Sequence, residues 1–400
     1  MTHHDAAVHL HLAHPQTAPA FFVGACRTPA PPHAAAAAIY RPLARFLHDH
    51  RLHLVQERIF GSLSVRPDVL AARHAALPPA FAGPDAPITY VEGMPPWGPG
   101  LAGVIVRAVP AAELLHPVAV IHDRDHPVGR TWQDAHATWV VLQGLGAQPS
   151  AGRPADPPAQ QTRQTIELAH RLLAAHGLDF THVVRTWFYL SDILAWYPDF
   201  NHARSELYQG FGLFPAPEGD LLLPASTAIS GRNPAGAALS LDLLALKPHH
   251  PCPDLVRRLS NPRQEEAFRY GSAFARGAVV RLPCSGEIQV SGAAAIDLSG
   301  ASLHPGDLEA QIASTLDCIA ALLAEENAGL TDVTAGTVFV KRSADGAAFW
   351  RWAQAHDLQD LPAVTVLADV CRPELLFELD AEAALPASVR PAGPLSPRQA

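Results

Sequence analysis

The chain has 400 residues, a formal net charge of −9, 48% hydrophobic residues and 17% charged residues. This length exceeds the usual size of one hydrophobic core, so two domains are expected. The composition is typical of a globular protein and excludes a disordered one. No run of Lys and Arg stands out, which argues against a nucleic-acid partner.

The sequence also lacks signals for membranes or export. No stretch approaches the roughly 18 uninterrupted apolar residues of a transmembrane helix. The N-terminus, MTHHDAAVHLHLAHPQ, has neither the basic start nor the apolar block of a signal peptide. The five cysteines form no CxxC pair and are interpreted as free thiols of a reduced, cytoplasmic protein.

An internal repeat organises much of the chain. The segment TIELAHRLLAAHGLDFTHV (165–183) resembles TLDCIAALLAEENAGLTDV (315–333), and both carry apolar residues at helical spacing. Each segment runs into a stretch rich in β-branched and aromatic residues, VVRTWFYLSD and TAGTVFVKRSAD, which predicts a strand.

The repeat continues toward the end of each copy. Residues 196–211 and 347–358 are the predicted second helices, and LPASTAISGRNPAGAALSLDLLALKP (223–248) aligns without gaps to LPAVTVLADVCRPELLFELDAEAALP (361–386). Each copy therefore reads as strands, helix, strand, second helix and closing strands. This order predicts an α+β fold in which helices cover one face of a mixed sheet.

The repeat gives the predicted domain boundaries. Residues 85–250 form the first copy, 251–264 a polar linker and 265–390 the second copy, which carries the candidate site. The first 84 residues have no counterpart in the second copy, so we interpret them as an N-terminal elaboration of the first domain.

The last predicted strand, in LLFELDAEAAL (375–385), contains a carboxylate that needs explanation. Because strand residues alternate between faces, Glu378 and Asp380 share one face, and Phe377 and Leu379 share the other. A buried carboxylate is costly unless it is paired. A buried, protonated carboxyl can instead act as a general acid near neutral pH.

Comparison of the two copies favours the catalytic interpretation. The first copy has Ser240 at the position of Glu378, and Asn233 at that of Cys371, whereas Asp242 matches Asp380. Both copies thus contain the aspartate, but only the second copy contains the glutamate. The alternative is a paired structural acid.

The stretches RTWFYLSDIL, LPASTAISGRNPAGAALSLDLLA and YGSAFARG resemble the chorismatase family, over roughly residues 85–386. The order of elements resembles the RidA/YjgF-like fold, which implies two tandem RidA/YjgF-like domains. The family cleaves chorismate to pyruvate and a ring product, without metal or organic cofactor. The product is 3-hydroxybenzoate, a mixture of 3- and 4-hydroxybenzoate, or a dihydroxycyclohexadiene acid.

The resemblance also implies roles for individual residues. Glu378 matches the family's acid, and Cys371, seven residues earlier, matches a cysteine of the hydroxybenzoate-forming branches. Gly277, after the arginine of YGSAFARG, matches a position that tracks product type. The resemblance makes Cys371 a residue that shapes the pocket or steers the ring intermediate.

The two carboxylates of chorismate call for guanidinium groups, which bind carboxylates bidentately. The candidates are Arg232, Arg276 and Arg351. Tyr270 and Ser272 are candidates for additional hydrogen bonds to the substrate.

Other functions compete with chorismate cleavage. A RidA-type imine deaminase uses an arginine after the Pro-Ala of the LPA-x-T strand, where this chain has Ser226 and Val364. A catalytically silent module that binds an aromatic acid is the third hypothesis. The histidine motifs HLHLAH (9–14) and HDRDH (122–126) lie in a predicted tail and loop, so no metal site is expected. The oligomer is either a monomeric pseudo-dimer or a homotrimer, and the single-domain relatives favour the homotrimer.

Overall fold

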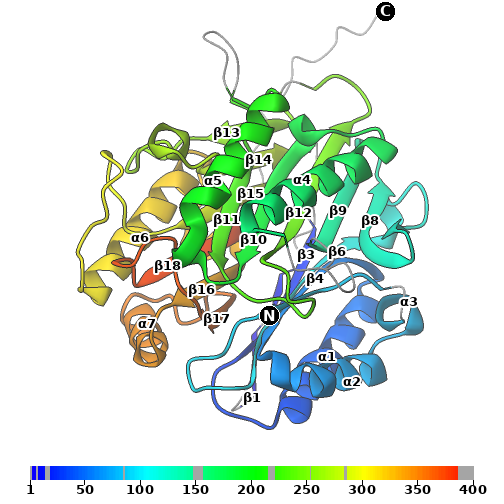
Figure 1. The fold of residues 1–400 in the computed structure, drawn as a ribbon. Helices are drawn as coiled ribbons and strands as arrows, with labels where there is room; N and C mark the ends of the chain where they lie inside the picture. The colour runs from blue at the N-terminus through cyan, green and yellow to red at the C-terminus, as the bar shows by residue number, and fades with distance from the viewer. Residues whose placement is uncertain are drawn as a thin grey trace, which may run out of the picture.

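The computed structural model describes residues 2–5, 8–13, 19–83, 86–146, 156–214, 221–252, 254–282 and 286–385. The described residues form three six-stranded sheets, each made by one continuous part of the chain (Figure 1). We call these parts unit 1 (residues 2–110), unit 2 (119–248) and unit 3 (256–384).

The three units contain the same succession of elements. Unit 1 comprises β1 (Thr2–Asp5), β2 (Val8–Ala13), β3 (Ala20–Cys26), α1 (Pro32–Asp49), β4 (Leu52–Gly61), α2 (Arg66–Ala76), α3 (Pro79–Ala82), β5 (Thr89–Glu92) and β6 (Leu101–Pro110). Unit 2 comprises β7 (Ala119–Asp123), β8 (His126–Gln133), β9 (Ala137–Leu145), α4 (Pro158–Ala175), β10 (Val183–Leu190), α5 (Ile193–Gly210), β11 (Ala225–Ser230) and β12 (Leu239–Pro248). Unit 3 comprises β13 (Val256–Leu259), β14 (Gly277–Arg281), β15 (Gly286–Ala293), α6 (Leu308–Ala324), β16 (Val333–Val340), α7 (Ser343–Ala355), β17 (Ala363–Leu367) and β18 (Phe377–Ala384).

The sheets also share one strand order. The orders are β1-β2-β3-β6-β4-β5, β7-β8-β9-β12-β10-β11 and β13-β14-β15-β18-β16-β17. In each sheet the closing strand lies in the middle, and the two strands that flank the second helix pair in parallel. The predicted α+β fold, with mixed sheets and helices on one face, is confirmed.

The N-terminal region differs from its prediction. Residues 1–84 were expected to elaborate the first domain, but residues 2–110 form a sheet of their own. The expected boundary after residue 84 falls inside that sheet, before β5 and β6. The expected linker 251–264 contains β13, which pairs with β14. The sequence comparison missed this third copy because unit 1 has the strand order of the other two units but lacks the sequence motifs that units 2 and 3 share.

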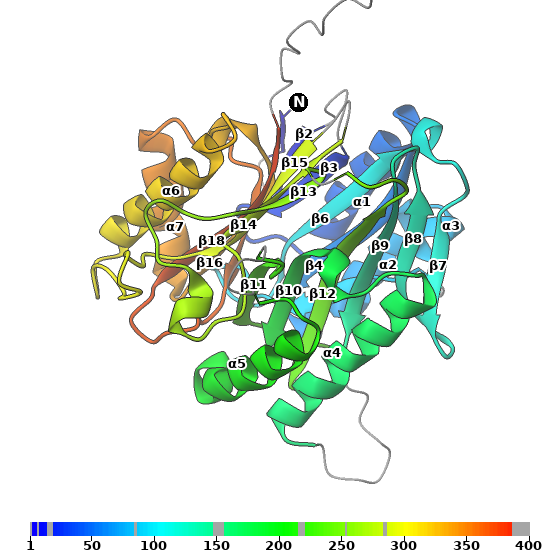
Figure 2. The same cartoon turned by 90° about the horizontal axis from the view of Figure 1, so that it is seen from above.

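The three sheets face one another, and their helices lie outside (Figure 2). A central apolar cluster draws side chains from all three sheets, including Phe21, Trp187 and Phe339. Each sheet packs a second apolar cluster against its own helices. One chain therefore contains three sheets packed around a common core. The predicted homotrimer is not needed to complete this arrangement and stays a prediction.

Burial on both faces explains the sequences of the inner strands. All eight residues of β10, VVRTWFYL, are buried, as are all eight of β16. Such strands read as continuous apolar runs because helices cover one face and other sheets cover the opposite face.

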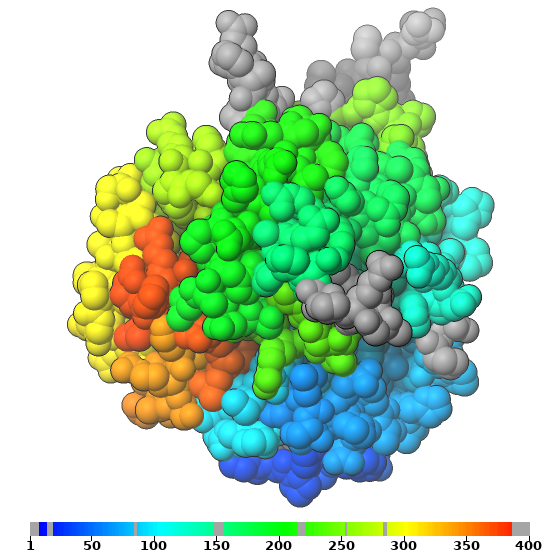
Figure 3. All heavy atoms as spheres, in the orientation of Figure 1, coloured from blue at the N-terminus to red at the C-terminus, as the bar shows by residue number. Residues whose placement is uncertain are grey.

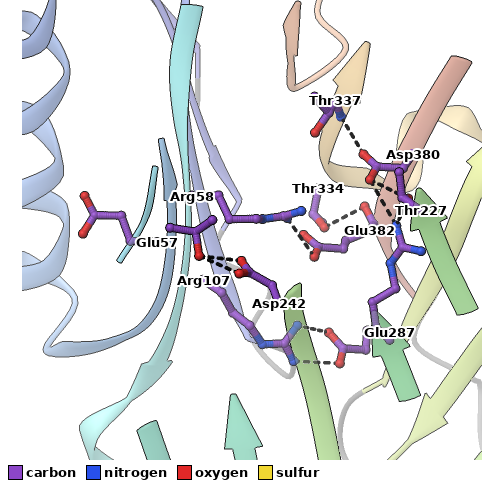
Figure 4. A network of polar contacts seen from close by, with 12 residues as sticks. Glu57, Arg58, Arg107, Thr227, Asp242, Glu287, Thr334, Thr337, Asp380 and Glu382 are labelled. Atoms are coloured by element: carbon purple, nitrogen blue, oxygen red, sulfur yellow. Dashed lines mark hydrogen bonds and ion pairs between the residues drawn. The ribbon is translucent and has the colours of Figure 1, made fainter. Parts of the chain in front are cut away.

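Buried ion pairs join the units where the sheets meet (Figure 4). Arg107 of β6 donates two hydrogen bonds of 2.7 Å to Glu287 of β15. Arg58 of β4 lies 3.1 Å from Glu382, and Arg185 of β10 lies 3.1 Å from Asp380. In each case unit 3 supplies the carboxylate and another unit supplies the guanidinium.

Cys26, Cys252, Cys318 and Cys371 form no disulfide among the described residues, and Cys284 lies outside them. Within the described ranges, no helix is long and apolar enough to cross a membrane.

The interunit ion pairs predict a large loss of stability when one partner is removed. Arg107→Met leaves the Glu287 carboxylate buried without its guanidinium, which should lower the free energy of unfolding by about 3–5 kcal/mol. Urea denaturation at pH 7 measures this loss. The matched control is Arg163→Met, because Arg163 pairs with Glu206 at the surface, and it should change stability little. Equal losses in both variants would contradict the prediction.

Candidate active site

A cavity of about 530 Å³ lies at the boundary between units 2 and 3. Unit 2 contributes side chains from α5 and β11. Unit 3 contributes β15, the segment 270–276, the loop before β18 and β18 itself. Glu378, Cys371, Arg276, Tyr270 and Ser272 all line this cavity, so the structure brings together most of the residues predicted for the site.

Glu378 enters the cavity from β18. The side chains of Phe377 and Leu379 point the other way, into the apolar cluster under α6 and α7. The alternation predicted from the sequence is therefore confirmed. Glu378 is only 5% exposed, and its carboxyl forms no hydrogen bond with any described residue.

Its surroundings keep the Glu378 carboxyl protonated. Burial, followed by repulsion from Asp380, raises its pKa to about 8, although Arg185 and Arg276 oppose this shift. A carboxyl with such a pKa holds its proton at neutral pH and can donate it to a bound molecule.

The charge of Asp380 is fixed by donors from two units. Thr227 Oγ1 lies 2.8 Å from Asp380 Oδ2, and a guanidinium nitrogen of Arg185 lies 3.1 Å from the same oxygen. The backbone N–H of Thr337 donates to the other oxygen at 3.1 Å. These three hydrogen bonds hold the Asp380 carboxylate beside Glu378.

Gly292 of β15 makes room for the acid, a role that the sequence did not reveal. A Cβ atom at this position would lie 2.2 Å from Glu378 Oε1 and 3.0 Å from its carboxyl carbon. Any other residue would displace the carboxyl from the position that it occupies. Only the tertiary contact shows this requirement.

Cys371 lines the cavity from the loop between β17 and β18. Burial and the nearby Glu378 raise the pKa of its thiol to about 12. The group is therefore a neutral thiol, which fits a role in shaping the pocket better than one as a nucleophile.

The cavity contains cationic groups from both units. Arg276 donates to Tyr270 Oη at 2.8 Å and, through Nε, to the backbone oxygen of Glu265 at 2.9 Å. Arg372 also lines the cavity, where it donates to the backbone oxygen of Gly300 at 2.8 Å. The sequence analysis predicted Arg276 but not Arg372.

Arg204 of α5 is the most informative residue that the sequence analysis missed. Tyr197, Asn201 and Arg204 recur at helical spacing and all face the cavity. Arg204 is fully buried, and its Nε and Nη1 have no hydrogen-bond partner among the described residues. Its Nη2 donates to Asn201 Oδ1 at 2.7 Å. A buried guanidinium with unused donors is well suited to receive a carboxylate.

Comparison with known proteins agrees with this geometry. The family model Ribonuc_L-PSP, described as Endoribonuclease L-PSP, matches residues 273–385. Over 334 residues, the chain is 29% identical to a 3-hydroxybenzoate synthase of Streptomyces hygroscopicus. The aligned region covers 72% of this chain and 92% of that protein. The chain is therefore similar to a 3-hydroxybenzoate synthase over most of the length of both proteins.

One solved structure shares the fold over most of the chain. The crystal structure of a chorismatase matches 82% of this chain and 92% of its own, with a TM-score of 0.58 and 20% identity. Yeast Mmf1 matches 32% of this chain and 97% of its own, with a TM-score of 0.27 and 16% identity.

Three residues predicted for the chorismatase site lie elsewhere. Arg232 is exposed and pairs with Glu92 of unit 1. Arg351 of α7 lines a different cavity, between units 1 and 3. Gly277 begins β14, where a Cβ atom would lie 3.0 Å from Leu322 Cδ2 of α6, on the helix side of the sheet. Arg351 was predicted from its spacing to Glu378 along the sequence. That spacing does not show that α5, and not α7, covers the boundary at which Glu378 lies.

The raised pKa of Glu378 predicts a specific pH dependence of stability. A glutamate whose pKa is higher in the folded than in the unfolded state stabilises the fold below its unfolded pKa of about 4.3. That stabilisation is lost as the pH rises through about 8. Glu378→Gln should therefore become more stable, relative to wild type, between pH 5 and pH 8.5.

Urea denaturation of both proteins across this range measures the difference. Glu374→Gln is the control, because a hydrogen bond from Ser302 lowers the pKa of Glu374. Glu374 is therefore ionised in both the folded and the unfolded state across this range, and the stability difference between its variant and wild type should not change with pH. A stability difference between Glu378→Gln and wild type that stays constant with pH would argue against a protonated Glu378.

Proposed function

We propose that the protein cleaves chorismate, releases pyruvate and forms 3-hydroxybenzoate, with Glu378 as the general acid. The observation that carries the proposal is a buried carboxyl, protonated at neutral pH, in a cavity with three guanidinium groups. The similarity to a 3-hydroxybenzoate synthase supports the choice of product. The formation of 4-hydroxybenzoate as a second product is the finer alternative.

The reaction begins with proton transfer to carbon. The Glu378 carboxyl donates its proton to the side-chain methylene of the enolpyruvyl ether, forming a C–H bond and an oxocarbenium ion. The C4 hydroxyl of the ring adds to this ion and gives up its proton, which forms a cyclic ketal. Cleavage of the bond between the ketal carbon and the C3 oxygen, which takes up a proton, and then of the ring C4–O bond releases pyruvate. Loss of the proton at C3 makes the ring aromatic and gives 3-hydroxybenzoate. Conversion of chorismate to hydroxybenzoate and pyruvate requires no net water, whereas formation of the diol consumes one water molecule.

The remaining cavity residues position the substrate. We assign the two carboxylates of chorismate to Arg204 and Arg276, with hydrogen bonds from Tyr270 and Ser272. Cys371 forms part of the cavity wall next to Glu378. Because its thiol is neutral, it does not react with the ring intermediate, which can then become aromatic. The effect of Gly277 on product choice remains a prediction from the family resemblance. Any such effect would act through packing.

The imine deaminase gains no support from this site. Ser226 lines the cavity, and it stands where the deaminase interpretation requires an arginine. A module that only binds an aromatic acid would bind chorismate without releasing pyruvate, so the assay that tests the enzyme separates these functions.

Removal of the acid should abolish turnover. With chorismate as substrate, we expect wild type to release pyruvate, and Glu378→Gln to lower kcat by about 10²–10⁴-fold. The wild-type rate should fall as the pH rises through about 8, because the acid loses its proton. A coupled pyruvate assay and chromatography of the ring products measure both effects. Glu374→Gln, at a partly exposed glutamate bonded to Ser302, should retain activity.

Each outcome has a distinct meaning. Pyruvate with 3-hydroxybenzoate would support the full proposal. Pyruvate with a non-aromatic diol would keep Glu378 as the acid but overturn the role of Cys371. No pyruvate from the wild type would reject chorismate cleavage and leave an acid-binding module.

Arg204 should contribute to substrate binding. Arg204→Met removes the unused donors, and loss of one charged hydrogen-bonding partner should raise KM by about 10–100-fold. Steady-state kinetics measure this effect. Arg232→Met is the matched control, since Arg232 pairs with Glu92 outside the cavity, and its KM should equal that of wild type. An equal rise in both variants would contradict the assignment.

A further inference from the structure

A second cavity, of about 640 Å³, lies at the boundary between units 1 and 3. Its walls are formed by elements equivalent to those of the first cavity, but each element belongs to the next unit around the core. Helix α7 and strand β17 of unit 3 take the places of α5 and β11, and unit 1 contributes β3 and the loop before its closing strand β6. The two cavities share no lining residue.

The second cavity lacks the acid. Glu378 lies opposite Phe339 in the register of β18 with β16, and Gly103 lies opposite Phe60 in the register of β6 with β4. Gly103 therefore occupies the position of Glu378. A Cβ atom there would lie 2.7 Å from Val364 Cγ2 and 2.5 Å from the backbone oxygen of Gly24. This cavity has no room for a carboxyl at that point and does not repeat the proposed chemistry.

The cavity nevertheless keeps two cationic side chains. The guanidinium carbon of Arg27 lies 3.2 Å from the ring centroid of Trp350. Both terminal nitrogens of Arg27 are buried and have no hydrogen-bond partner among the described residues. Burial lowers the pKa of Arg27 to about 9, so the group is still cationic at neutral pH. Arg351, an exposed residue of α7, lines the same cavity and forms no ion pair within the described chain.

The remaining lining fits a flat apolar ring. Trp97, Trp350 and Pro96 supply aromatic and apolar surface, and Gln354 and Gln359 supply hydrogen-bonding groups. A desolvated guanidinium whose terminal nitrogens have no hydrogen-bond partner is costly, and a carboxylate is the ligand whose geometry matches it. We propose that this second cavity binds an aromatic monocarboxylate, held by Arg27 and Arg351 and packed against Trp97 and Trp350.

Binding in this cavity should move the Trp350 indole. Solvent does not reach the terminal nitrogens of Arg27, so an anion must displace the side chains over them. The Trp350 ring lies against the guanidinium and is held by one hydrogen bond, from Nε1 to Thr365 Oγ1, at 2.9 Å. The first cavity, in contrast, has no tryptophan among its lining residues. Tryptophan fluorescence therefore reports on the second cavity.

Titration of the full-length protein with sodium benzoate tests the proposal. We expect a saturable change in tryptophan fluorescence in wild type and in Arg204→Met, whose change lies in the first cavity. Arg351→Met should weaken benzoate binding about 10-fold or more, and Arg27→Met should weaken it at least as much. Arg171→Met, at an exposed arginine of α4, should bind as wild type does. Trp350→Phe should lose most of the signal.

Other results would overturn the proposal. One is the absence of any saturable change up to the solubility limit of benzoate. Another is a signal abolished by Arg204→Met but unaffected by Arg351→Met, which would place the benzoate in the first cavity. A third is equal affinity for neutral benzamide, which would exclude recognition of the charge. Because Arg351 is exposed on α7, its variant should fold even if Arg27→Met does not.

Discussion

The assembly of the three sheets depends on buried ion pairs in which unit 3 supplies every carboxylate. Glu382, Glu287 and Asp380 meet the guanidinium groups of Arg58, Arg107 and Arg185, which come from units 1 and 2. Removing these charges from water is expensive, so each pair is stable only when its partner is in place. The ion pairs join unit 3 to units 1 and 2, at the same two boundaries that contain the two cavities.

The same position in the three closing strands has taken three different residues. Glu378, Ser240 and Gly103 lie opposite Phe339, Tyr189 and Phe60 in otherwise equivalent registers. The glutamate supplies an acid, the serine has no carboxyl and the glycine leaves only backbone. In the first cavity the closing strand of unit 3 faces the second helix of unit 2, and no residue of that closing strand lines the second cavity. A change at position 378 therefore alters the lining of the first cavity and leaves that of the second intact. The repeated fold thus allows one boundary to carry chemistry and another to carry a binding site.

The sequence predicted what depends on local pattern and self-comparison. Alternation along β18 placed Glu378 and Asp380 on one face, and comparison of units 2 and 3 singled out the glutamate. Unit 1 escaped notice because a sheet of this kind needs buried apolar strands in a given order, not particular residues. Arg232 and Arg351 were chosen by position along the chain, which does not reveal the boundary that each one faces. Arg204 could have been suspected, since a helical arginine flanked by Tyr197, Phe200 and Tyr208 has little access to water.

Asp380 connects the assembly of the sheets with the chemistry proposed for the site. Its carboxylate pairs with Arg185 across the boundary between units 2 and 3, and its negative charge raises the pKa of Glu378. Arg185 acts on Glu378 in the opposite direction. A shift of unit 2 relative to unit 3 would therefore change the balance of these two charges on Glu378. Burial is the largest cause of the raised pKa of Glu378, and the two partners of the ion pair that joins units 2 and 3 act on it with opposite signs. The contact that joins the two units therefore also belongs to the electrostatic surroundings of the acid.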